Sequence, residues 1–383
     1  MNFINRRNLI KKLSLVGSSY ILTNCTLFDI SPDCENLSTS GKTIIDKCKI
    51  TPAGCNSGLP RYNFEILERT TTSLLQADKP WESFGIGYST VMYNGQKWQM
   101  WYESLGTDIN DFLSYLCYAE SADGVRWVKP KVGLNLYNNS YNNNILLSGK
   151  SECNGIHGPT IFIDPDAPTN EKYKMTYSKQ HNTDLSWIYG AVSKDGIFWS
   201  KERCLLKRNS DTQTVCIKDG NSYKLYSRLN RPLADGTFRR TIGYSESSTF
   251  AANSFCDPVE IFGPDGLDDE KMDFYNSALT KINSRLYIML PSAFYYSEDT
   301  VIPHLAFSED GINFCRFNRT PFIQLGKEFD TMSIYVSPGA VPGPKADTYW
   351  LYYTGVDIGH NQRNFPNAYS GGIGRFLLKI ISN

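Results

Sequence analysis

A short turn motif recurs along the chain and constrains its fold more than any other feature. Residues 121–127 (Ser-Ala-Asp-Gly-Val-Arg-Trp) recur as residues 193–199 (Ser-Lys-Asp-Gly-Ile-Phe-Trp) and as residues 308–314 (Ser-Glu-Asp-Gly-Ile-Asn-Phe), with a degraded copy at residues 245–250. Asp-Gly favours a tight hairpin turn, because glycine accepts a positive φ and aspartate binds nearby backbone. We therefore interpret these aspartates as structural, and expect the following ring to pack where neighbouring sheets meet.

Segments typical of β-strands precede each copy of the motif. They alternate apolar and polar residues and are rich in rings and β-branched side chains, and no long segment shows a strong helical period. They group into five units of three or four strands, each of about 50–70 residues, which is typical of a five-bladed β-propeller. The fifth unit lacks the Asp-Gly turn. A large β-sandwich or a β-helix is the alternative all-β fold, but the hairpin within each unit disfavours it. The expected strands are residues 88–93, 97–103, 160–164, 173–178, 212–217, 223–228, 275–282, 286–291, 334–341, 348–354 and 372–380.

The composition excludes two broad classes of protein. Lys and Arg number 39 and so do Asp and Glu, which gives a formal net charge of zero. Nonspecific electrostatic binding of nucleic acid needs a basic protein surface, so we expect no nucleic-acid partner. Hydrophobic residues make up 41% of the chain, which argues against intrinsic disorder.

The first 24 residues have the layout of an export signal. Four basic residues and no acid precede a short apolar stretch at residues 13–22. The pair Arg6-Arg7 resembles a twin-arginine motif. Residues 22–25 resemble a lipoprotein cleavage box, although Asn24 departs from the small residue usual there, so lipidation of Cys25 and an unmodified terminus both stay open. We expect an exported protein, periplasmic, at the cell surface or extracellular. The alternative is a basic N-terminus that carries no signal.

After the signal we expect two regions. Residues 25–79 show no sustained period and are interpreted as a loop-rich tether or wrap, and residues 80–383 as the propeller. None of the ten cysteines forms a C-x-x-C pair, which disfavours a zinc knuckle or a redox motif. An oxidising compartment permits disulfides. We expect Cys34, Cys48 and Cys55 to form such bonds, and Cys117, Cys216 and Cys315 to be buried as small apolar residues.

Three further segments are similar to the openings of propeller blades. They are residues 158–162 (Gly-Pro-Thr-Ile-Phe), 273–277 (Asp-Phe-Tyr-Asn-Ser) and 335–340 (Tyr-Val-Ser-Pro-Gly-Ala). With the turn motif and the strand rhythm over about residues 80–380, the chain resembles the five-bladed propeller glycoside hydrolases, which include fructosidases, arabinanases and xylosidases. The resemblance implies an O-glycosyl hydrolase with an oligo- or polysaccharide substrate. The oligomeric state stays open.

The usual catalytic motifs of that group are missing. The fructosidase branch has a Trp-Asn-Asp-Pro-like opening and an Arg-Asp-Pro triplet, and neither occurs in this chain. The arabinanase branch has an aspartate where this chain has Thr160. The chain therefore resembles a divergent member, and its catalytic residues must be predicted from their position.

Position favours acids that lie just before the innermost strands. The innermost strand of each blade lines the axial channel, and glycoside cleavage needs two carboxyl groups there. Of the four acids at such positions, Glu82, Asp211, Asp273 and Asp330, we predict Glu82 and Asp273 as the catalytic pair, with Asp330 next. Glu82 follows Trp81, whose ring can desolvate a carboxyl group, and Asp273 opens a polar and aromatic segment. The alternative role for each is a solvated loop acid or a strand cap.

Other polar and aromatic residues at the same end are predicted to bind substrate. Rings can stack on sugar faces, and histidine, asparagine and acidic side chains can bind hydroxyl groups. The predicted substrate-binding residues are Trp81, His157, Asp211, Tyr275, Asn276, Tyr335 and His360. Glu103, Lys179 and Arg228 are instead expected in ion pairs between blades. The four histidines are too scattered for a metal motif, so we predict no metal site and no cofactor, and leave a central structural ion open.

Two other functions remain compatible with the sequence. A propeller without catalytic acids would be a surface protein that binds glycan or protein. A glycoside phosphorylase would need a basic phosphate pocket, for which Lys179, Arg228 and Arg231 are the candidates.

Overall fold

The structure is a computed structural model that describes residues 62–108, 111–149, 155–180, 185–362 and 371–382. The expected all-β class is confirmed. The helical elements of the described residues are short 3₁₀ turns, η2 (Pro80–Glu82), η4 (Thr169–Glu171) and η5 (His360–Gln362). Among these residues no helix has the length and apolar character needed to cross a membrane.

Three of the sheets contain four antiparallel strands each. The first contains β8 (His157–Ile163), β9 (Tyr173–Gln180), β10 (Ser186–Ser193) and β11 (Trp199–Leu206). The second contains β12 (Val215–Asp219), β13 (Ser222–Pro232), β14 (Phe238–Ser247) and β15 (Val259–Phe262). The third contains β17 (Leu279–Asn283), β18 (Leu286–Met289), β21 (Ala306–Ser308) and β22 (Cys315–Arg316).

Two sheets are larger. A five-stranded sheet contains β3 (Gly85–Tyr93), β4 (Trp98–Asp108), β5 (Asp111–Ser121), β6 (Trp127–Val128) and β7 (Ile145–Gly149). A nine-stranded sheet joins both ends of the described chain. Its strands are β1 (Tyr62–Arg69), β2 (Leu75–Gln76), β16 (Met272–Phe274), β19 (Ser292–Tyr295), β20 (Thr300–Pro303), β23 (Ser333–Val336), β24 (Val341–Pro342), β25 (Thr348–Val356) and β26 (Gly372–Ser382).

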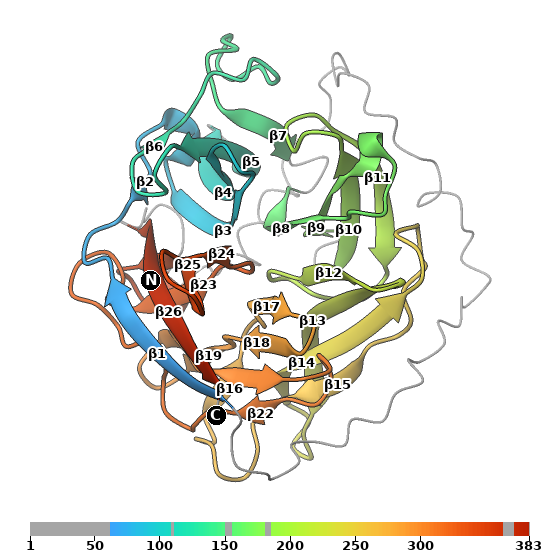
Figure 1. The fold of residues 1–383 in the computed structure, drawn as a ribbon, viewed down its shortest axis with the longest axis vertical. Helices are drawn as coiled ribbons and strands as arrows, with labels where there is room; N and C mark the ends of the chain where they lie inside the picture. Colours follow the sequence, from blue (N-terminus) through green and yellow to red (C-terminus); the bar gives the residue numbers. More distant parts are fainter. Residues whose placement is uncertain (1–61, 109–110, 150–154, 181–184, 363–370, 383) are drawn as a thin grey trace.

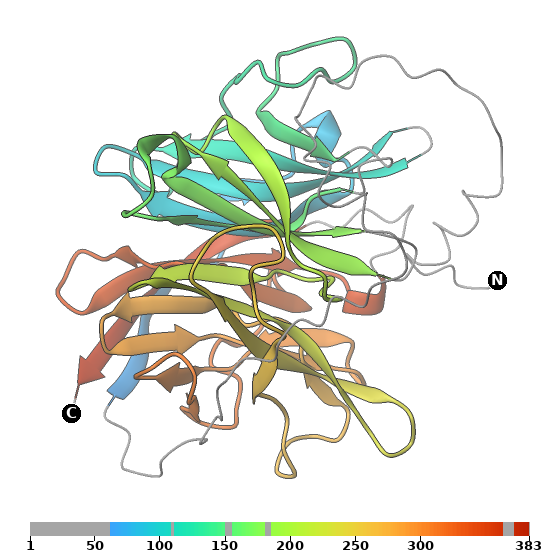
Figure 2. The ribbon, with the colours of Figure 1, turned by 90° about the vertical axis from the view of Figure 1, so that its right-hand side faces the viewer.

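These sheets are arranged as a β-propeller. Figure 1 shows β3, β8, β12 and β17 around a common centre, together with β23 and β24 of the nine-stranded sheet. Figure 2 shows the same sheets from the side, one above another along the length of the molecule. The expected propeller is therefore confirmed, whereas the number of blades stays a prediction, because one sheet runs through nine strands.

The expected boundary at residue 80 lies too late in the chain. β1 begins at Tyr62 and pairs antiparallel with β26, from Tyr62 opposite Ser382 to Arg69 opposite Phe376. β2 pairs with the start of the same strand. Residues 62–76 therefore belong to the propeller, because their backbone covers one edge of β26. The signal expected at residues 1–24, Cys25, and the part of the expected tether (residues 25–79) that precedes Tyr62 lie outside the described residues.

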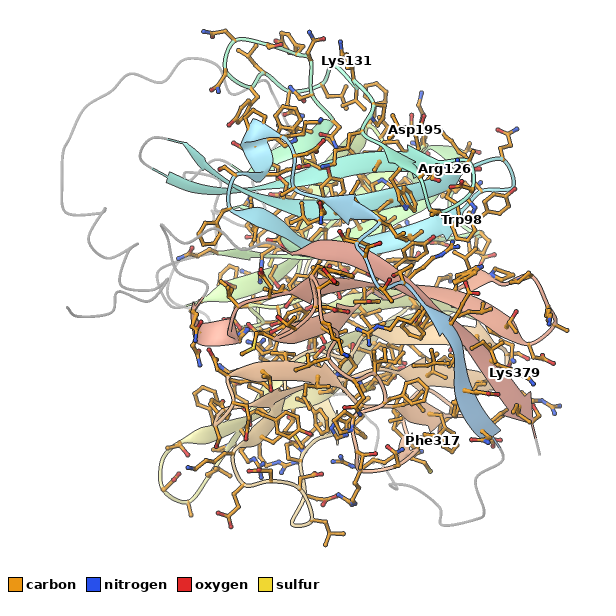
Figure 3. All side chains as sticks on the ribbon, turned by 90° about the vertical axis from the view of Figure 1, so that its left-hand side faces the viewer. Trp98, Arg126, Lys131, Asp195, Phe317 and Lys379 are labelled. Atoms are coloured by element: carbon orange, nitrogen blue, oxygen red, sulfur yellow. The ribbon has the colours of Figure 1, made fainter. Side chains whose placement is uncertain are left out.

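The recurring motif forms the same turn in each intact copy. In residues 121–127 the Ser121 hydroxyl accepts hydrogen bonds from the amides of Asp123 and Gly124. The Asp123 carboxylate accepts hydrogen bonds from the amides of Val125 and Arg126. The glycine has a φ of 71° in that copy, and Gly196 and Gly311 are similar at 77° and 76°. The structural role expected for the motif aspartates agrees with this geometry. Figure 3 shows Asp195 and Arg126 on the same side of the molecule.

The cysteines differ partly from expectation. Cys117 and Cys216 are fully buried free thiols, as expected, and burial raises the pKa of both. Cys315 was expected to be a buried apolar residue, but it is half-buried and disulfide-bonded, as is Cys256. Cys315 lies on β22, the edge strand of its sheet, where neighbouring strands do not enclose a side chain from both sides.

Candidate functional site

β-Bulges orient the side chains of Tyr88 and His157 toward one end of the axis, at which the innermost strands β3 and β8 begin. The pairing of β3 with β4 shifts between Ile86 and Ser89, and the pairing of β8 with β9 shifts between His157 and Thr160. A bulge redirects the side chains that flank it. The side chain of Tyr88 therefore faces the ring of His157 from the neighbouring sheet, with the ring centroids 5.5 Å apart.

A cluster of rings joins several sheets at this end of the axis. Tyr88 also contacts Tyr335 of β23 (centroids 5.5 Å), and Tyr335 contacts Tyr275, the residue after β16 (6.1 Å). His360 of η5 packs on Tyr275 at 4.7 Å, and its Nδ1 shares a hydrogen bond of 2.8 Å with the Tyr335 hydroxyl. We define the axial cluster as these rings together with three charged residues. Its members are Tyr88, His157, Tyr275, Tyr335, His360, Glu103, Asp211 and Arg228.

A histidine and a buried carboxylate form one side of the axial cluster. The Nδ1 of His157 lies 2.8 Å from Oε1 of Glu103, and the Gly158 amide donates to the other oxygen at 3.3 Å. The Glu103 side chain is 1% exposed, whereas His157 is 20% exposed. Glu103 therefore fixes the orientation of the imidazole, whose Nε2 makes no hydrogen bond within the described residues.

The backbone at Gly158 brings this pair against the next sheet. Gly158 has a φ of 61°, and a Cβ at this position would lie 2.6 Å from backbone atoms of Gln213 and 3.0 Å from the carbonyl carbon of Thr212. Only glycine permits that approach. Thr212 in turn shares a hydrogen bond of 3.0 Å with the Tyr88 hydroxyl.

An arginine and an aspartate form the opposite side of the axial cluster. Arg228 of β13 donates from Nη1 to Oδ1 of Asp211 and from Nε to the Tyr275 carbonyl at 3.2 Å. Its guanidinium lies 4.0 Å from the centroid of the Tyr275 ring. The Arg228 side chain is 4% exposed, whereas Asp211 is 46% exposed. Asp211 is therefore a carboxylate that solvent reaches, and a buried cation holds it in place.

Burial and neighbouring groups shift the pKa values of the cluster. Burial, with the adjacent Tyr275 and Tyr335, raises the pKa of Tyr88 well above its usual value. Burial opposes the charge of Arg228, but Asp211 and Tyr275 outweigh it and raise the pKa of the guanidinium. Tyr88 therefore stays a neutral hydroxyl and Arg228 stays charged at any ordinary pH.

The predicted catalytic acid Glu82 lies in a different cluster. Its Oε1 accepts the Tyr102 hydroxyl at 2.6 Å, and its Oε2 accepts Lys129 Nζ at 2.7 Å and the Asp78 amide at 2.9 Å. The side chain is fully buried. Trp81 is also buried, and it donates to Asn144 Oδ1 at 3.0 Å. These contacts favour a structural role for Glu82 and for Trp81.

Asp330 and Asp273 also have partners of their own. Asp330 accepts from Arg69 of β1 and from the Tyr353 hydroxyl at 2.9 Å, and it is 2% exposed. Asp273 accepts from Arg240 at 3.1 Å and from the Tyr296 hydroxyl at 2.6 Å. No described contact joins Glu82, Asp273 and Asp330 to one another. Asp273 does lie next to the axial cluster, because the Arg240 guanidinium is 5.7 Å from the Tyr275 ring centroid.

Five of the seven predicted binding residues meet in the axial cluster. They are His157, Asp211, Tyr275, Tyr335 and His360. Asn276 follows Tyr275 but is 1% exposed, and neither of its amide atoms has a partner in the described part of the chain. The described residues contain no group of three or more potential metal-ligating side chains.

Glu103 was expected in an ion pair between blades, and it does pair with His157 of the neighbouring sheet, but sequence reasoning did not place Glu103 among the site residues and named Arg228 as a site residue only for a phosphate pocket. Both lie in the middle of the second strand of their sheets, β4 and β13, level with the start of the first strand: Glu103 is opposite the bulge between Ile86 and Ser89, and Arg228 lies two residues beyond Tyr226, the partner of Val215. In an antiparallel hairpin the second strand ends where the first begins, so these residues return to the same end of the axis. A polar residue of the second strand that lies level with the start of the first strand is therefore the signal that would have identified them. Lys179 and Arg231 instead pair with Glu202 and Glu260.

This arrangement can bind a polar ring compound and move protons. It presents an exposed carboxylate, an oriented histidine and aromatic faces within one network of contacts. Sites for small polar ligands combine apolar walls with a few such groups. Histidine and carboxylate side chains are the usual general acids and bases.

Comparison with known proteins supports the fold. No family model and no curated protein sequence matches the chain. Solved structures do match, among them one described as a glycoside hydrolase, with a TM-score of 0.57, 14% identity, and 81% of this chain and 92% of the matched protein covered. An N-acetylgalactosamine deacetylase from F. plautii, in complex with blood group B trisaccharide, has a TM-score of 0.56 and 13% identity over 83% and 94% of the two proteins.

A third match belongs to the GH130 family, which is described as mannoside phosphorylases that include glycoside hydrolases targeting β-1,2 mannosidic linkages in Candida mannan. It has a TM-score of 0.52 and 14% identity, with 84% of this chain and 96% of the matched protein covered. At these identities the likeness shows the fold. The chain therefore has the propeller fold found in these carbohydrate-active proteins.

Proposed function

We propose that this protein cleaves a glycosidic bond at the axial cluster of a five-bladed propeller. The observation that carries the proposal is the meeting of Asp211 and His157 with rings from several sheets at one end of the axis. Fold alone does not define an activity, so the argument rests on these side chains. The substrate is an oligo- or polysaccharide, whose rings stack on Tyr275 and whose hydroxyl groups bind His360.

We also propose that the propeller has five blades, by dividing the nine-stranded sheet. Strands β23, β25, β26 and β1 are consecutive in its order and form a four-stranded unit like the other sheets. β20 joins that unit only through a parallel bridge between Val301 and Ser333. We assign β16, β19 and β20 to an extension beside the axis, which leaves five blades.

In the proposed reaction Asp211 and His157 have complementary roles. Asp211 accepts a proton from water, whose oxygen attacks the anomeric carbon. His157 donates a proton to the leaving glycosidic oxygen as the bond to that carbon breaks. Glu103 holds the imidazole and Arg228 holds the carboxylate, so neither group must reorganise during the reaction. Direct attack of water in this way inverts the anomeric centre.

The test is hydrolysis of a panel of aryl glycosides and of plant, algal and microbial glycans. Replacing a general acid or base typically lowers the rate by roughly 10²–10⁴-fold, which is the loss expected for Asp211→Asn and His157→Gln. Asp257→Asn is the matched control, because Asp257 also pairs with an arginine, Arg208, outside the axial cluster. Release of no sugar from any member of the panel contradicts the proposal.

Asp273→Asn separates this assignment from the one predicted from sequence. If Asp273 were the catalytic acid, Asp273→Asn would abolish turnover while Asp211→Asn retained it. With the assignment proposed here, Asp211→Asn shows the larger loss. A protein that binds the same glycans without turnover would instead be the non-catalytic propeller.

A glycoside phosphorylase is the second candidate. One observation favours it: Arg228 lies in the axial cluster with an Nη2 that is buried and has no partner in the described part of the chain. Guanidinium groups are well suited to phosphate. Turnover that requires inorganic phosphate and yields a sugar 1-phosphate would establish this activity in place of hydrolysis.

We also propose that the protein is exported. The disulfide-bonded state of Cys256 and Cys315 supports this location, because disulfides persist mainly in oxidising compartments. The basic and apolar N-terminus supports it independently, and Cys25 is the proposed lipid attachment site. Fractionation of cells that express the protein with and without Cys25→Ser tests both points, and recovery of both forms only in the cytoplasm contradicts export.

A further inference from the structure

The rim beside Tyr275 carries a second group of polar and aromatic side chains. β13 and β14 pair without a bulge, so Asn230 lies opposite Arg240 and Pro232 opposite Phe238. Residues that are directly opposite share one face of a sheet, as do alternate residues along a strand. Arg228, Asn230, Arg240 and Phe238 therefore lie on one face, which runs from the axial cluster outward to the tip of the hairpin.

Arg240 presents an open hydrogen-bonding edge on this face. Its Nη1 donates to Asp273 at 3.1 Å and to the Tyr296 hydroxyl. Its Nε and Nη2 donate to no described residue, and neither belongs to the buried unpartnered atoms. These two nitrogens form one side of the planar guanidinium. Paired N–H groups of that kind bind a carboxylate through two parallel hydrogen bonds.

The charges around Arg240 favour an anion. Asp273 lies between two guanidiniums, with Arg240 Nη1 at 3.1 Å and Arg239 Nε at 3.8 Å. Its single carboxylate cannot neutralise both. The positive charge that remains lies at the outer side of Tyr275, whose ring centroid is 5.7 Å from the Arg240 guanidinium.

Exposed rings flank the same arginine. Phe238 is 47% exposed and Tyr296 is 42% exposed. The Arg240 guanidinium lies 5.9 Å from the Phe238 ring centroid, and Tyr296 is held by its bond to Asp273. An aromatic face of this kind offers an apolar surface to the ring of a sugar. An arginine edge between two such rings suits a ligand that combines a sugar ring with a carboxylate.

We propose that Phe238, Arg240 and Tyr296 form an outer subsite for a uronic acid residue of the substrate. This proposal rests on the proposed function, because the subsite adjoins the axial cluster where the bond is cleaved. The uronate carboxylate accepts hydrogen bonds from Nε and Nη2 of Arg240, and its ring packs on an exposed aromatic face. The substrate is accordingly an acidic oligosaccharide chain that extends along β13 and β14.

Calorimetric binding to paired probes tests this subsite. The probes are oligosaccharides that contain glucuronate, galacturonate or mannuronate, each compared with the same molecule after reduction of its carboxyl groups to alcohols. We expect at least one acidic probe to bind the full-length protein about tenfold more tightly than its reduced form, since bonds between charged partners are the stronger ones. The preference should weaken as salt rises.

Variants assign the preference to Arg240. Arg240→Gln should abolish it, while Arg231→Gln should keep it, because Arg231 lies on the opposite face of the same hairpin and pairs with Glu260. Thermal melting confirms that both variants fold. An equal affinity for acidic and reduced probes, or a preference that persists in Arg240→Gln, overturns the subsite and leaves the proposed function intact. Failure of every probe to bind, acidic or reduced, also overturns the subsite, whereas the proposed function is overturned only by the absence of turnover on the glycan panel.

Discussion

His304 is a buried base whose protonation the fold opposes. It is 2% exposed, its Nε2 lies 2.9 Å from the Tyr295 hydroxyl, and its Nδ1 has no partner among the described residues. Its ring packs edge-on against Phe274 at 5.8 Å. Burial, and next the charge of Arg316, lower the pKa of His304 from 6.5 to about 4. A group of this kind makes the free energy of folding depend on pH.

The dependence falls between pH 6.5 and pH 4. Below pH 6.5 His304 binds a proton in the unfolded chain but stays neutral in the folded chain. Stability therefore decreases as pH falls, and it levels off below pH 4, where both states are protonated. The total loss of stability is at most about 3.5 kcal/mol. His304→Gln should flatten this part of a plot of urea unfolding free energy against pH.

A lower pH range provides the control. The pKa of Asp265 is lowered to about 2, chiefly by its bond with Arg319, so its stabilisation is lost only as pH falls below about 4. That loss should persist in His304→Gln. An unchanged slope between pH 6.5 and pH 4.5 in the variant would show that other groups cause it.

The candidate site shows how far residue positions can be predicted from sequence. His157, Asp211, Tyr275 and Tyr335 were predicted from their place before or within first strands, and the structure brings them together. Glu82 also lies just before a first strand, but its carboxylate forms an ion pair with Lys129, which is 47 residues further along the chain. Such partners depend on packing between distant segments, which strand periodicity does not encode.

At the scale of elements, the turn motif also joins neighbouring sheets. The carbonyl of each motif glycine accepts a hydrogen bond from a ring of the adjacent sheet. Trp101 donates to Gly196 at 2.6 Å, Tyr226 to Gly311 at 2.9 Å and Tyr352 to Gly124 at 2.7 Å. The shared geometry therefore serves the contact between sheets as well as the turn.

The degraded copy fits the same rule. In the strand register, Ser247 pairs with Tyr223 just as the motif serine Ser193 pairs with Tyr173. Ser247 therefore occupies the position of the motif serine, two residues after Ser245, the serine expected from sequence. In the preceding sheet, β9 has Thr176 at the position that corresponds to Trp101 of β4. Thr176 has no ring to donate to the turn, and its hydroxyl donates to the Thr214 carbonyl instead. Where the turn has lost its glycine, the neighbouring sheet also lacks the ring.

Removing one ring hydroxyl should weaken the junction between two sheets. Tyr226→Phe leaves the Gly311 carbonyl without its buried donor while the ring still fills the core, so we expect a loss of about 1–3 kcal/mol in the free energy of unfolding. Urea denaturation measures it. Tyr141→Phe, at a tyrosine that is 55% exposed, is the control and should change stability by less than about 0.5 kcal/mol. Equal stabilities of the two variants would refute the role of the bond.

Strand existence was easier to predict than strand partnership. β3, β4, β9, β13 and β25 agree with the segments expected from alternation and ring content. β1 was not expected, because its sequence, with Glu65 and Glu68 exposed, resembles a polar linker. Its identity as a strand comes from the open edge of β26, more than 300 residues away, which only the closed fold provides.

At the scale of the whole molecule, β1 closes the propeller. It pairs with β26 along its length, and Phe64 crosses to the neighbouring sheet, where it packs on Phe307 at 5.7 Å and on Phe317 at 5.3 Å. Arg69, at the end of β1, bonds Asp330, so the buried carboxylate has a cationic partner from the first described strand. β1 thus covers the edge of β26 that would otherwise be open, and its Phe64 ring packs this sheet against the neighbouring one.

Closure predicts that damage to β1 spreads through the fold. Phe64→Ala removes a ring that is 5% exposed and should cost about 3–5 kcal/mol in the free energy of unfolding. Because the sheets share contacts around the axis, hydrogen exchange should accelerate in β17, β18 and β23 as well as in β1. Leu67→Ala on the same strand, at a residue that is 42% exposed, should leave exchange unchanged. Acceleration confined to residues 62–69 in Phe64→Ala would mean that β1 frays independently and that the ring of sheets holds without it.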